Sequence, residues 1–292
     1  MDERLLQMLA IGLSLGAIYT IIALGYSVVY KATRVVNFAH CQYLMVGGLV
    51  AAWLNRDLGV GLLWAVGAGV GAGMILGAIT EIVAVRLLKQ KDPLTITVGT
   101  VVIGLIVEAL ALQATAGSTY SMKTPWPSLS FSIAGVAFSG QTFWNLAIAV
   151  ALTIGLSEFF RHTRRGIGLQ AAADNHETAA LYGVSRTTTT LSVFLIAGLL
   201  GGVGGVAMVP VTLMTSSLGL VFGLKGFAAA TLGGLGSIPG ALVGGLLIGL
   251  MEAFFAVYVS AALSSIVAFC VMLAVLLWRP TGLFREVAVE RV

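Results

Sequence analysis

The residues best suited to chemistry form a short polar run inside an otherwise apolar chain. Residues 165–185 read RGIGLQAAADNHETAALYGVS and place Asp174, Asn175, His176 and Glu177 in a row. Such side chains could bind a metal or catalyse, but within four helical positions they cannot all face one point, and no second ligand cluster follows. We therefore expect neither a metal site nor a catalytic site here.

The same run carries the local signals of a short helix over 174–183. Asp174 is expected to cap the first free amides, with Glu177 reaching back to it in a variant of the capping box. Gly183 suits the left-handed residue that ends a helix, and Ala179 and Ala180 give the last turn a small apolar surface that suits a groove. Two turns of helix are unstable alone. The run is therefore either an ordinary loop with a helical turn or a helix held by a partner surface.

A second polar group follows the basic turn that contains Lys31 and Arg34. The stretch VVNFAHCQ places Asn37, His40 and Gln42 inside an apolar run. Polar side chains in lipid must find partners and are the default functional candidates. Asn37 can cap a helix, whereas His40 and Gln42 either bond a neighbouring helix or line a translocation path.

Single charged residues also interrupt the apolar runs. Glu108 lies near the middle of one run without accompanying acids and histidines, so we expect it to pair with another helix and not to relay protons. Glu81 is expected to pair with Arg86, and an ion pair between Lys225 and Glu252 is conceivable. Among these residues we assign Glu108 to the candidate substrate pathway.

Glycine marks another candidate site. In TLGGLGSIPGALVGGLLIG (231–249), Gly236 and Pro239 predict a backbone break, which at membrane depth is tolerated only inside protein or beside a watery cavity. We place this break on the substrate pathway or its gate. Pairs of glycines four residues apart predict close helix packing; they are Gly12/Gly16, Gly69/Gly73, Gly201/Gly205, Gly240/Gly244 and Gly245/Gly249.

The composition places these residues in a membrane protein. Of 292 residues, 58% are hydrophobic and 10% are charged, against about 25% charged in soluble domains. Continuous apolar runs indicate helices and not a β-barrel. We predict an all-α polytopic fold with about 8–9 transmembrane helices and a broken or re-entrant Gly-rich segment near 219–240. The expected spans are 5–29, 36–54, 60–86, 94–116, 141–160, 188–210, 219–236, 239–257 and 260–278.

The distribution of charge predicts the orientation. Twelve of the 16 Lys and Arg residues lie in the connections 30–35, 86–92 and 161–187 and in the tail from residue 279. Basic loops stay in the cytoplasm, so the N-terminus is expected outside and the 161–187 loop inside. The 117–140 connection then lies outside, as an ordinary loop or as a docking surface for an outer partner.

Four segments resemble the LivH family, the membrane permease subunits of branched-chain amino-acid type ABC transporters. They are GLSLGAIYTIIALGYSVVYKATRVVNFAHCQYLMVGG (12–48), GIGLQAAADNHETAALYGVSRTTTTLSVFLIAGLLGGVGGV (166–206), GLKGFAAATLGGLGSIPGALVGGLLIGLMEAF (223–254) and RPTGLF (279–284). One departure is visible, because the family usually continues NFAH with Gly-Glu and this chain has Cys41-Gln42. Loss of that carboxylate puts a plain branched-chain amino-acid substrate in doubt.

The resemblance implies one permease domain over 1–292, in a bacterial-type cytoplasmic (inner) membrane, with 174–183 as the coupling helix. It implies a second LivM-like permease subunit, two ATP-binding subunits and an extracytoplasmic solute-binding protein as partners, beside the lipid bilayer. No GxxxxGK[ST] loop occurs in the chain, so ATP must bind elsewhere. We expect no cofactor and no nucleic-acid partner. An ion-coupled transporter or a channel is the alternative, and a membrane-embedded enzyme ranks last because no catalytic constellation is visible.

Overall fold

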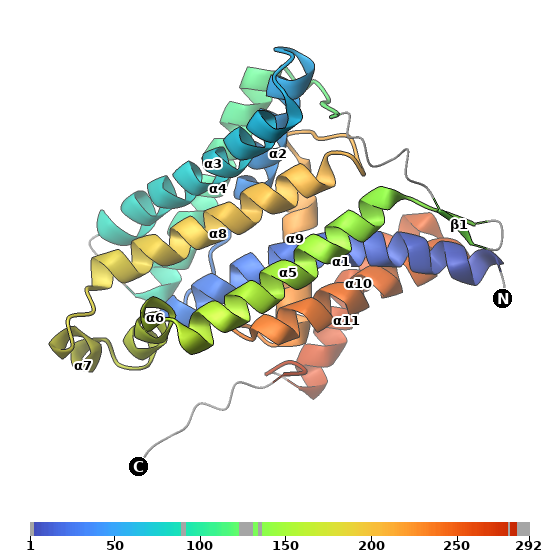
Figure 1. The fold of residues 1–292 in the computed structure, drawn as a ribbon. Coiled ribbons are helices and arrows are strands. Elements are labelled where there is room, and N and C mark those ends of the chain that lie inside the picture. The colour runs from blue at the N-terminus through green and yellow to red at the C-terminus, as the bar shows by residue number, and fades with distance from the viewer. Residues whose placement is uncertain (1–2, 89–91, 123–130, 134–135, 280, 285–292) are drawn as a thin grey trace.

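The computed structural model describes residues 3–88, 92–122, 131–133, 136–279 and 281–284 (Figure 1). The helices are α1 (Glu3–Thr33), α2 (His40–Arg56), α3 (Leu62–Glu81), the π-helix η1 (Ile82–Arg86), α4 (Pro93–Thr115), α5 (Gly140–His162), α6 (Arg164–Asp174), α7 (His176–Leu181), α8 (Arg186–Met208), α9 (Leu218–Gly233), α10 (Ile238–Tyr258) and α11 (Ala261–Trp278). Two short strands, β1 (Phe131–Ile133) and β2 (Val136–Phe138), pair antiparallel.

The expected membrane spans are confirmed as helices. Each of the nine expected ranges coincides with a helix, the range 60–86 covering both α3 and η1, and seven helices of the described residues are long and apolar enough to cross a membrane. The predicted break in the Gly-rich segment near 219–240 is confirmed, and α9 within this segment runs for 16 residues. The break follows it, where Gly234 and Gly236 have φ angles of 99° and 92°. These left-handed angles favour glycine because it lacks a Cβ atom.

Glycine lets α1 and α10 pack with their backbones in close approach. A Cβ atom added to Gly12 would lie 2.8 Å from the Leu250 side chain, and one at Gly16 would lie 2.9 Å from the Leu246 backbone. A Cβ atom at Gly249 would in turn meet Gly16. The predicted packing role of these glycines is therefore confirmed, and the contact of α1 with α10 forms the centre of the bundle.

A second glycine seam joins α2, α3 and α8. A Cβ atom added to Gly69 would lie 2.9 Å from the Ala51 side chain. A Cβ atom at Gly201 would lie 2.5 Å from Tyr43 Cβ. The core lies along these two seams, since α1 and α8 are 61% buried over their most apolar windows while α4 and α11 are 17% buried. The exposed faces of α4 and α11 are apolar, as contact with lipid or with another membrane subunit requires.

The two ends of the bundle carry different structures. In Figure 1, α6 and α7 lie at one end, beside the end of α5 and the start of α8, while the β1–β2 hairpin and the N-terminus lie at the other. Arg34 and Asp174 approach to 3.7 Å and join the connections after α1 and after α6. The part of the expected outer loop at 123–130, including Trp126, lies outside the described residues.

Candidate translocation path and coupling loop

Two of the predicted pathway residues meet across α2 and α4. Gln42 Nε2 donates to Glu108 Oε2 at 3.1 Å, so the expectation that Glu108 pairs with another helix is confirmed. Gln42 is 2% exposed, and its Oε1 has no hydrogen-bond partner among the described residues. A buried acceptor without a donor is costly, so the hydrogen bonding of this pair is incomplete.

An apolar groove continues from this pair between the same two helices. Positions 42, 46, 49, 50 and 53 share one face of α2, because residues three and four apart are neighbours on a helix. The groove has a volume of about 510 Å³, within the range of small-molecule sites. Its lining is almost entirely apolar and consists of Val46, Leu49, Val50, Trp53, Val107, Leu110, Ala111, Ala114, Thr115 and Tyr120.

The other two polar residues of the VVNFAHCQ stretch are packed inside the protein. Asn37 donates to Tyr43 Oη at 3.0 Å and accepts from the Ala39 amide at 3.1 Å. The His40 ring lies between the rings of Tyr26 and Tyr43, with centroids 5.0 and 5.5 Å away. Neither ring nitrogen of His40 has a partner in the part of the chain that the structure describes. Asn37 orders the turn before α2, although α2 itself begins only at His40.

A buried ion pair joins α9 and α10, as the sequence suggested. Lys225 Nζ lies 2.6 Å from Glu252 Oε1, and the two side chains are 6% and 9% exposed. Tyr19 donates to Glu252 Oε2 at 2.7 Å, and Lys225 donates to Ser265 Oγ at 3.2 Å. The sequence did not reveal Tyr19 and Ser265 as partners, since hydroxyl side chains are common in these helices. Both charges have fixed partners, so this cluster connects α1, α9, α10 and α11.

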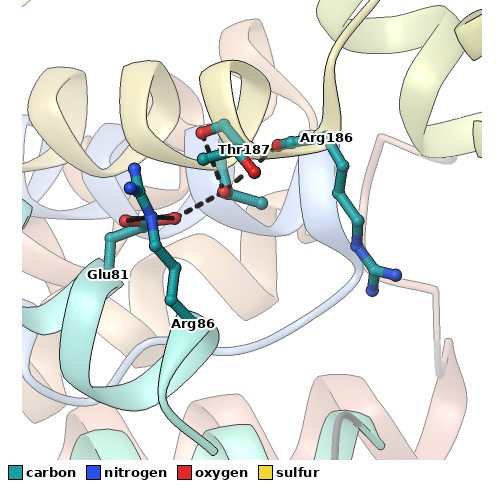
Figure 2. Close-up of polar contacts among 5 residues, drawn as sticks. Glu81, Arg86, Arg186 and Thr187 are labelled. Carbon is teal, nitrogen blue, oxygen red and sulfur yellow. Dashed lines mark hydrogen bonds and ion pairs between the residues drawn. The ribbon is translucent and has the colours of Figure 1, made fainter.

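A second buried carboxylate connects α3 and α8 near the loop 161–187 (Figure 2). Arg86 Nε lies 2.8 Å from Glu81 Oε2, which confirms the expected pair. Thr190 donates to Glu81 Oε1 at 2.7 Å, a partner that the sequence did not indicate. Figure 2 shows the Arg186 guanidinium pointing away from this cluster. The fully buried Glu81 thus fastens η1 to the first turns of α8.

The loop 161–187, the candidate coupling loop, contains two helices where one was expected. Asp174 ends α6 and does not cap α7, so its predicted role is wrong. Asn175 takes the cap instead: its backbone is extended, and its side chain accepts from the Thr178 amide at 3.0 Å. Glu177 is exposed. Gly183 ends the turn with a φ angle of 81°, as predicted.

The apolar end of α7 points away from the bundle. Ala179 is 4% exposed and faces inward, whereas Ala180 lies at the surface. Leu181 and Tyr182 are 86% and 85% exposed. These two side chains make the loop tip a candidate contact surface for another protein.

The break after α9 lies far from the Gln42–Glu108 pair. A Cβ atom at Gly219, in the first turn of α9, would lie 2.8 Å from Gln42 Oε1. Gly236 and Pro239 follow the other end of α9, roughly 20 Å further along at 1.5 Å per residue. The amides of Leu283 and Phe284 donate there, at 2.9 and 3.0 Å, to the last carbonyls of α9. The structure therefore does not bring all the predicted pathway residues together.

Together, the membrane-length helices, the groove with a polar inner end and the exposed loop helix define a polytopic α-helical membrane transport protein. The family model described as "Branched-chain amino acid transport system / permease component" matches residues 8–276. The chain belongs to this family. It is a multi-pass protein of the cytoplasmic membrane and a permease component of a transport system.

Similar proteins cover nearly the whole chain. The permease protein BraD of the high-affinity branched-chain amino acid transport system of Pseudomonas aeruginosa is 30% identical, over 98% of this chain and 98% of that protein. The corresponding permease protein LivH of Escherichia coli is 30% identical over 98% and 97%. A probable LivH permease of Methanocaldococcus jannaschii is 30% identical over 90% and 87%.

A weaker similarity exists among solved structures. PsaBC from Streptococcus pneumoniae in complex with Fab aligns with 92% of this chain and 89% of that chain, at 16% identity and a TM-score of 0.41. This similarity is too low to carry an argument about the fold or the site.

Proposed function

We propose that the chain is the membrane-spanning subunit of an ABC importer for amino acids of the branched-chain type or related small polar or aromatic solutes. The family match over residues 8–276 supports the transport role. The observation that carries the proposal is the fully exposed apolar tip of α7, Leu181 and Tyr182, in a chain without a phosphate-binding loop. A surface of this kind needs a partner, and an ATPase supplies the missing energy source.

The partners follow from this assignment. Two ATP-binding subunits contact the cytoplasmic loop 161–187, a second LivM-like permease subunit completes the membrane part, and an extracytoplasmic solute-binding protein delivers the solute. The chain itself hydrolyses no ATP in this proposal. The exposed apolar faces of α4 and α11 supply area for the second permease subunit and for lipid.

The pathway is proposed to run beside α2 and α9. Gln42 and Glu108 border it at the outer end of α9, and Gly236 and Pro239 border its other end. Asn37 and His40 shape it from behind, because their side chains are buried among the tyrosines of α1 and α2.

The cluster in Figure 2 connects the loop to this pathway. When ATP binding moves α7, the start of α8 moves with it, and Thr190 transmits the shift through Glu81 to η1. The connection from η1 leads into α4, which carries Glu108. Movement of the loop can therefore open or close the groove between α2 and α4.

Affinity purification tests the subunit assignment. The tagged chain is purified from native membranes in mild detergent, and the associated chains are identified by mass spectrometry. We expect a P-loop ATPase and a second permease in stoichiometric amounts. A homo-oligomer without an ATPase would contradict the proposal and favour an ion-coupled transporter, for which the isolated Glu108 would be the coupling carboxylate.

Substitutions in α7 test the coupling role. Tyr182→Asp and Glu177→Lys should each uncouple ATP hydrolysis from uptake while the subunit stays in the membrane. Gly183→Val should do the same, because its φ angle of 81° strains any side chain although the surrounding space is open. Leu58→Asp in the connection after α2 is the control, since Leu58 is also exposed but lies outside the loop 161–187. Normal coupling in all three α7 variants would refute the role.

A further inference from the structure

A second pocket lies at the end of the bundle that carries the loop 161–187. It has a volume of about 640 Å³ and lies where α6 packs against the last turn of α5 and the first turns of α8 (Figure 1). The connection after α7, residues 183–185, completes its lining. The groove between α2 and α4 contributes no residue to it. This pocket is therefore separate from the proposed pathway.

The turn between α5 and α6 places two arginines at the polar end of the pocket. Thr163 caps α6: its Oγ1 accepts from the Gly166 amide at 2.9 Å and donates to the Phe159 carbonyl at 2.7 Å. Gly166 allows this tight turn, because a Cβ atom there would collide with the Phe159 carbonyl. Arg164 and Arg165 consequently occupy the first turn of α6, and both line the pocket.

The positive charge of these arginines is not balanced inside the pocket. Neither Arg164 nor Arg165 forms an ion pair with any residue that the structure describes, and the lining contains no acidic side chain. The preceding carboxylate in the sequence, Glu158, bonds His162 instead. The first turn of α6 also lacks an acidic residue, although the helix dipole favours negative charge there. An anion suits this end, and guanidinium groups bind phosphate with two parallel hydrogen bonds.

The face of α8 in this pocket changes from polar to apolar along the helix. Ser185, Thr188 and Ser192 come first, and Leu195 and Ile196 follow. Residues three and four apart are neighbours on a helix, so these side chains share one face. Within the described part of the chain, the three hydroxyls donate no hydrogen bond. The pocket therefore offers free donors near its basic end and an aliphatic wall at the other.

The aliphatic wall lies at membrane depth. Both α5 and α8 are long and apolar enough to cross a membrane. Ile196 lies about 15 Å from the start of α8 at 1.5 Å per residue. The hydrocarbon core of a bilayer is about 30 Å thick, so this depth corresponds to one leaflet. A water-soluble subunit does not reach that depth, whereas a lipid of the same leaflet does.

We propose that this pocket binds one anionic phospholipid of the leaflet that the loop 161–187 faces. The phosphate binds Arg164 and Arg165, and the hydroxyls of α8 donate to the headgroup and glycerol oxygens. One acyl chain lies against Leu195 and Ile196. Basic pockets between membrane helices select anionic headgroups, and burial of the chain adds affinity. The lipid thereby bridges α5, α6 and α8 below α7. This inference goes beyond the proposed function and does not depend on ATP as the energy source.

Native mass spectrometry tests both ends of the pocket. The full-length protein is delipidated in detergent and titrated with dioleoyl phosphatidylglycerol or with zwitterionic dioleoyl phosphatidylcholine. One phosphatidylglycerol should bind in preference to phosphatidylcholine. Arg164→Gln with Arg165→Gln should weaken its binding roughly 30-fold, because each basic residue at a membrane surface contributes about fivefold. Ile196→Ser should weaken binding as well, and glycerol 3-phosphate, which has no acyl chain, should not compete at the same concentration.

A matched control removes the same charge outside the pocket. Arg161→Gln with Arg279→Gln changes two exposed arginines that are expected on the same side of the membrane and do not line the pocket. This variant should keep the affinity of the unmodified protein. Equal losses in the two double variants would overturn the site, since general surface charge would then explain the binding. Equal binding of the two phospholipids, or competition by glycerol 3-phosphate, would overturn it too.

Photocrosslinking in native membranes identifies the occupant. The photoreactive residue p-benzoylphenylalanine replaces Leu195, and the irradiated protein is analysed by intact mass. We expect the added mass of one phospholipid, and this adduct should disappear in the Arg164→Gln, Arg165→Gln background but persist in the control background. An adduct with an ATP-binding subunit or a second permease, or no adduct, would overturn the lipid site. The proposed transport function stands under each of these outcomes.

Discussion

Two membrane carboxylates of this protein have opposite surroundings. Glu252 faces a lysine at 2.6 Å and a tyrosine hydroxyl at 2.7 Å, and both of its oxygens are engaged. Glu108 has one neutral partner, Gln42, whose other amide atom has no partner in the described part of the chain. The first carboxylate lies at the junction of four helices, and the second lies on a helix with little packing.

This contrast separates structural charge from functional charge. Burying a charge is tolerated when its partners are complete, and the Lys225–Glu252 pair then anchors the bundle. A polar group with spare capacity costs stability, and its position beside a groove supports the proposal that Glu108 borders the pathway. The following predictions test the contrast from the largest expected effect on stability to the smallest.

The largest effect is expected at the complete pair. Lys225→Met leaves Glu252 buried without its cation and should destabilise the protein by about 3–5 kcal/mol. The measurement is the thermal unfolding midpoint of the purified protein in detergent. The double variant Lys225→Met with Glu252→Leu should recover most of the loss, because no charge remains. Equal midpoints for the single variant and the unmodified protein would remove the anchoring role.

An intermediate effect is expected at the cluster in Figure 2. Thr190→Val keeps the shape of the side chain but removes the hydroxyl that donates to Glu81. Loss of a hydrogen bond to a charged group costs about 1.5–3 kcal/mol. The same unfolding assay should show a smaller shift than Lys225→Met. Thr97→Val is a suitable control, because the Thr97 hydroxyl is exposed and bonds only a backbone carbonyl. If Thr97→Val lowered the unfolding midpoint as much as Thr190→Val, the bond from Thr190 to Glu81 would have no special role in stability.

A small effect is expected at the open pair. Glu108→Gln keeps a partner for the Gln42 amide and should change the stability by no more than about 0.5 kcal/mol. Its effect should fall on uptake instead, because Glu108 borders the proposed pathway. Strong destabilisation by Glu108→Gln would show that Glu108, like Glu252, is needed for stability, and would contradict the difference between the two carboxylates.

The smallest effect concerns the start of α4. Hydrogen bonds from the Thr95 hydroxyl and amide lower the pKa of Asp92, the exposed cap of this helix. The pKa of Asp92 is therefore lower in the folded state than in the unfolded state, where it is about 3.9. The charged cap stabilises the folded protein at pH values above the unfolded pKa, and this stabilisation is lost as the pH falls through the folded pKa. Asp92→Ala should slightly lower the unfolding midpoint at pH 7. The difference from the unmodified protein should shrink as the pH falls below about 3.9, and a difference that did not change with pH would contradict this explanation.

The sequence predicted most of the fold because membrane helices follow from long apolar runs. The limits of the nine expected spans lie within a few residues of the observed helices. The pairs Glu81–Arg86 and Lys225–Glu252 were also predictable, since an intramembrane charge needs a partner and an opposite charge was near in each case.

The contacts between distant helices were less predictable. Gln42 and Glu108 are 66 positions apart, and their pairing depends on how α4 packs beside α2. The cap of α7 was misplaced by one residue because α6 continues through Asp174. Two neighbouring residues, Asp174 and Asn175, have similar capping preference, so only the length of α6 decides between them. The roles of Gly236 and Pro239 in the pathway remain predictions.

The most direct test of the central claim is ATP-driven transport by the purified complex. The chain and its copurifying subunits are reconstituted into liposomes with the ATP sites and the solute-binding protein accessible, and leucine accumulation is followed with and without ATP. We predict accumulation that requires ATP and is abolished by Tyr182→Asp in α7 at normal levels of the assembled complex. Accumulation that needs no ATP and follows an imposed proton or sodium gradient would contradict the account and establish an ion-coupled transporter.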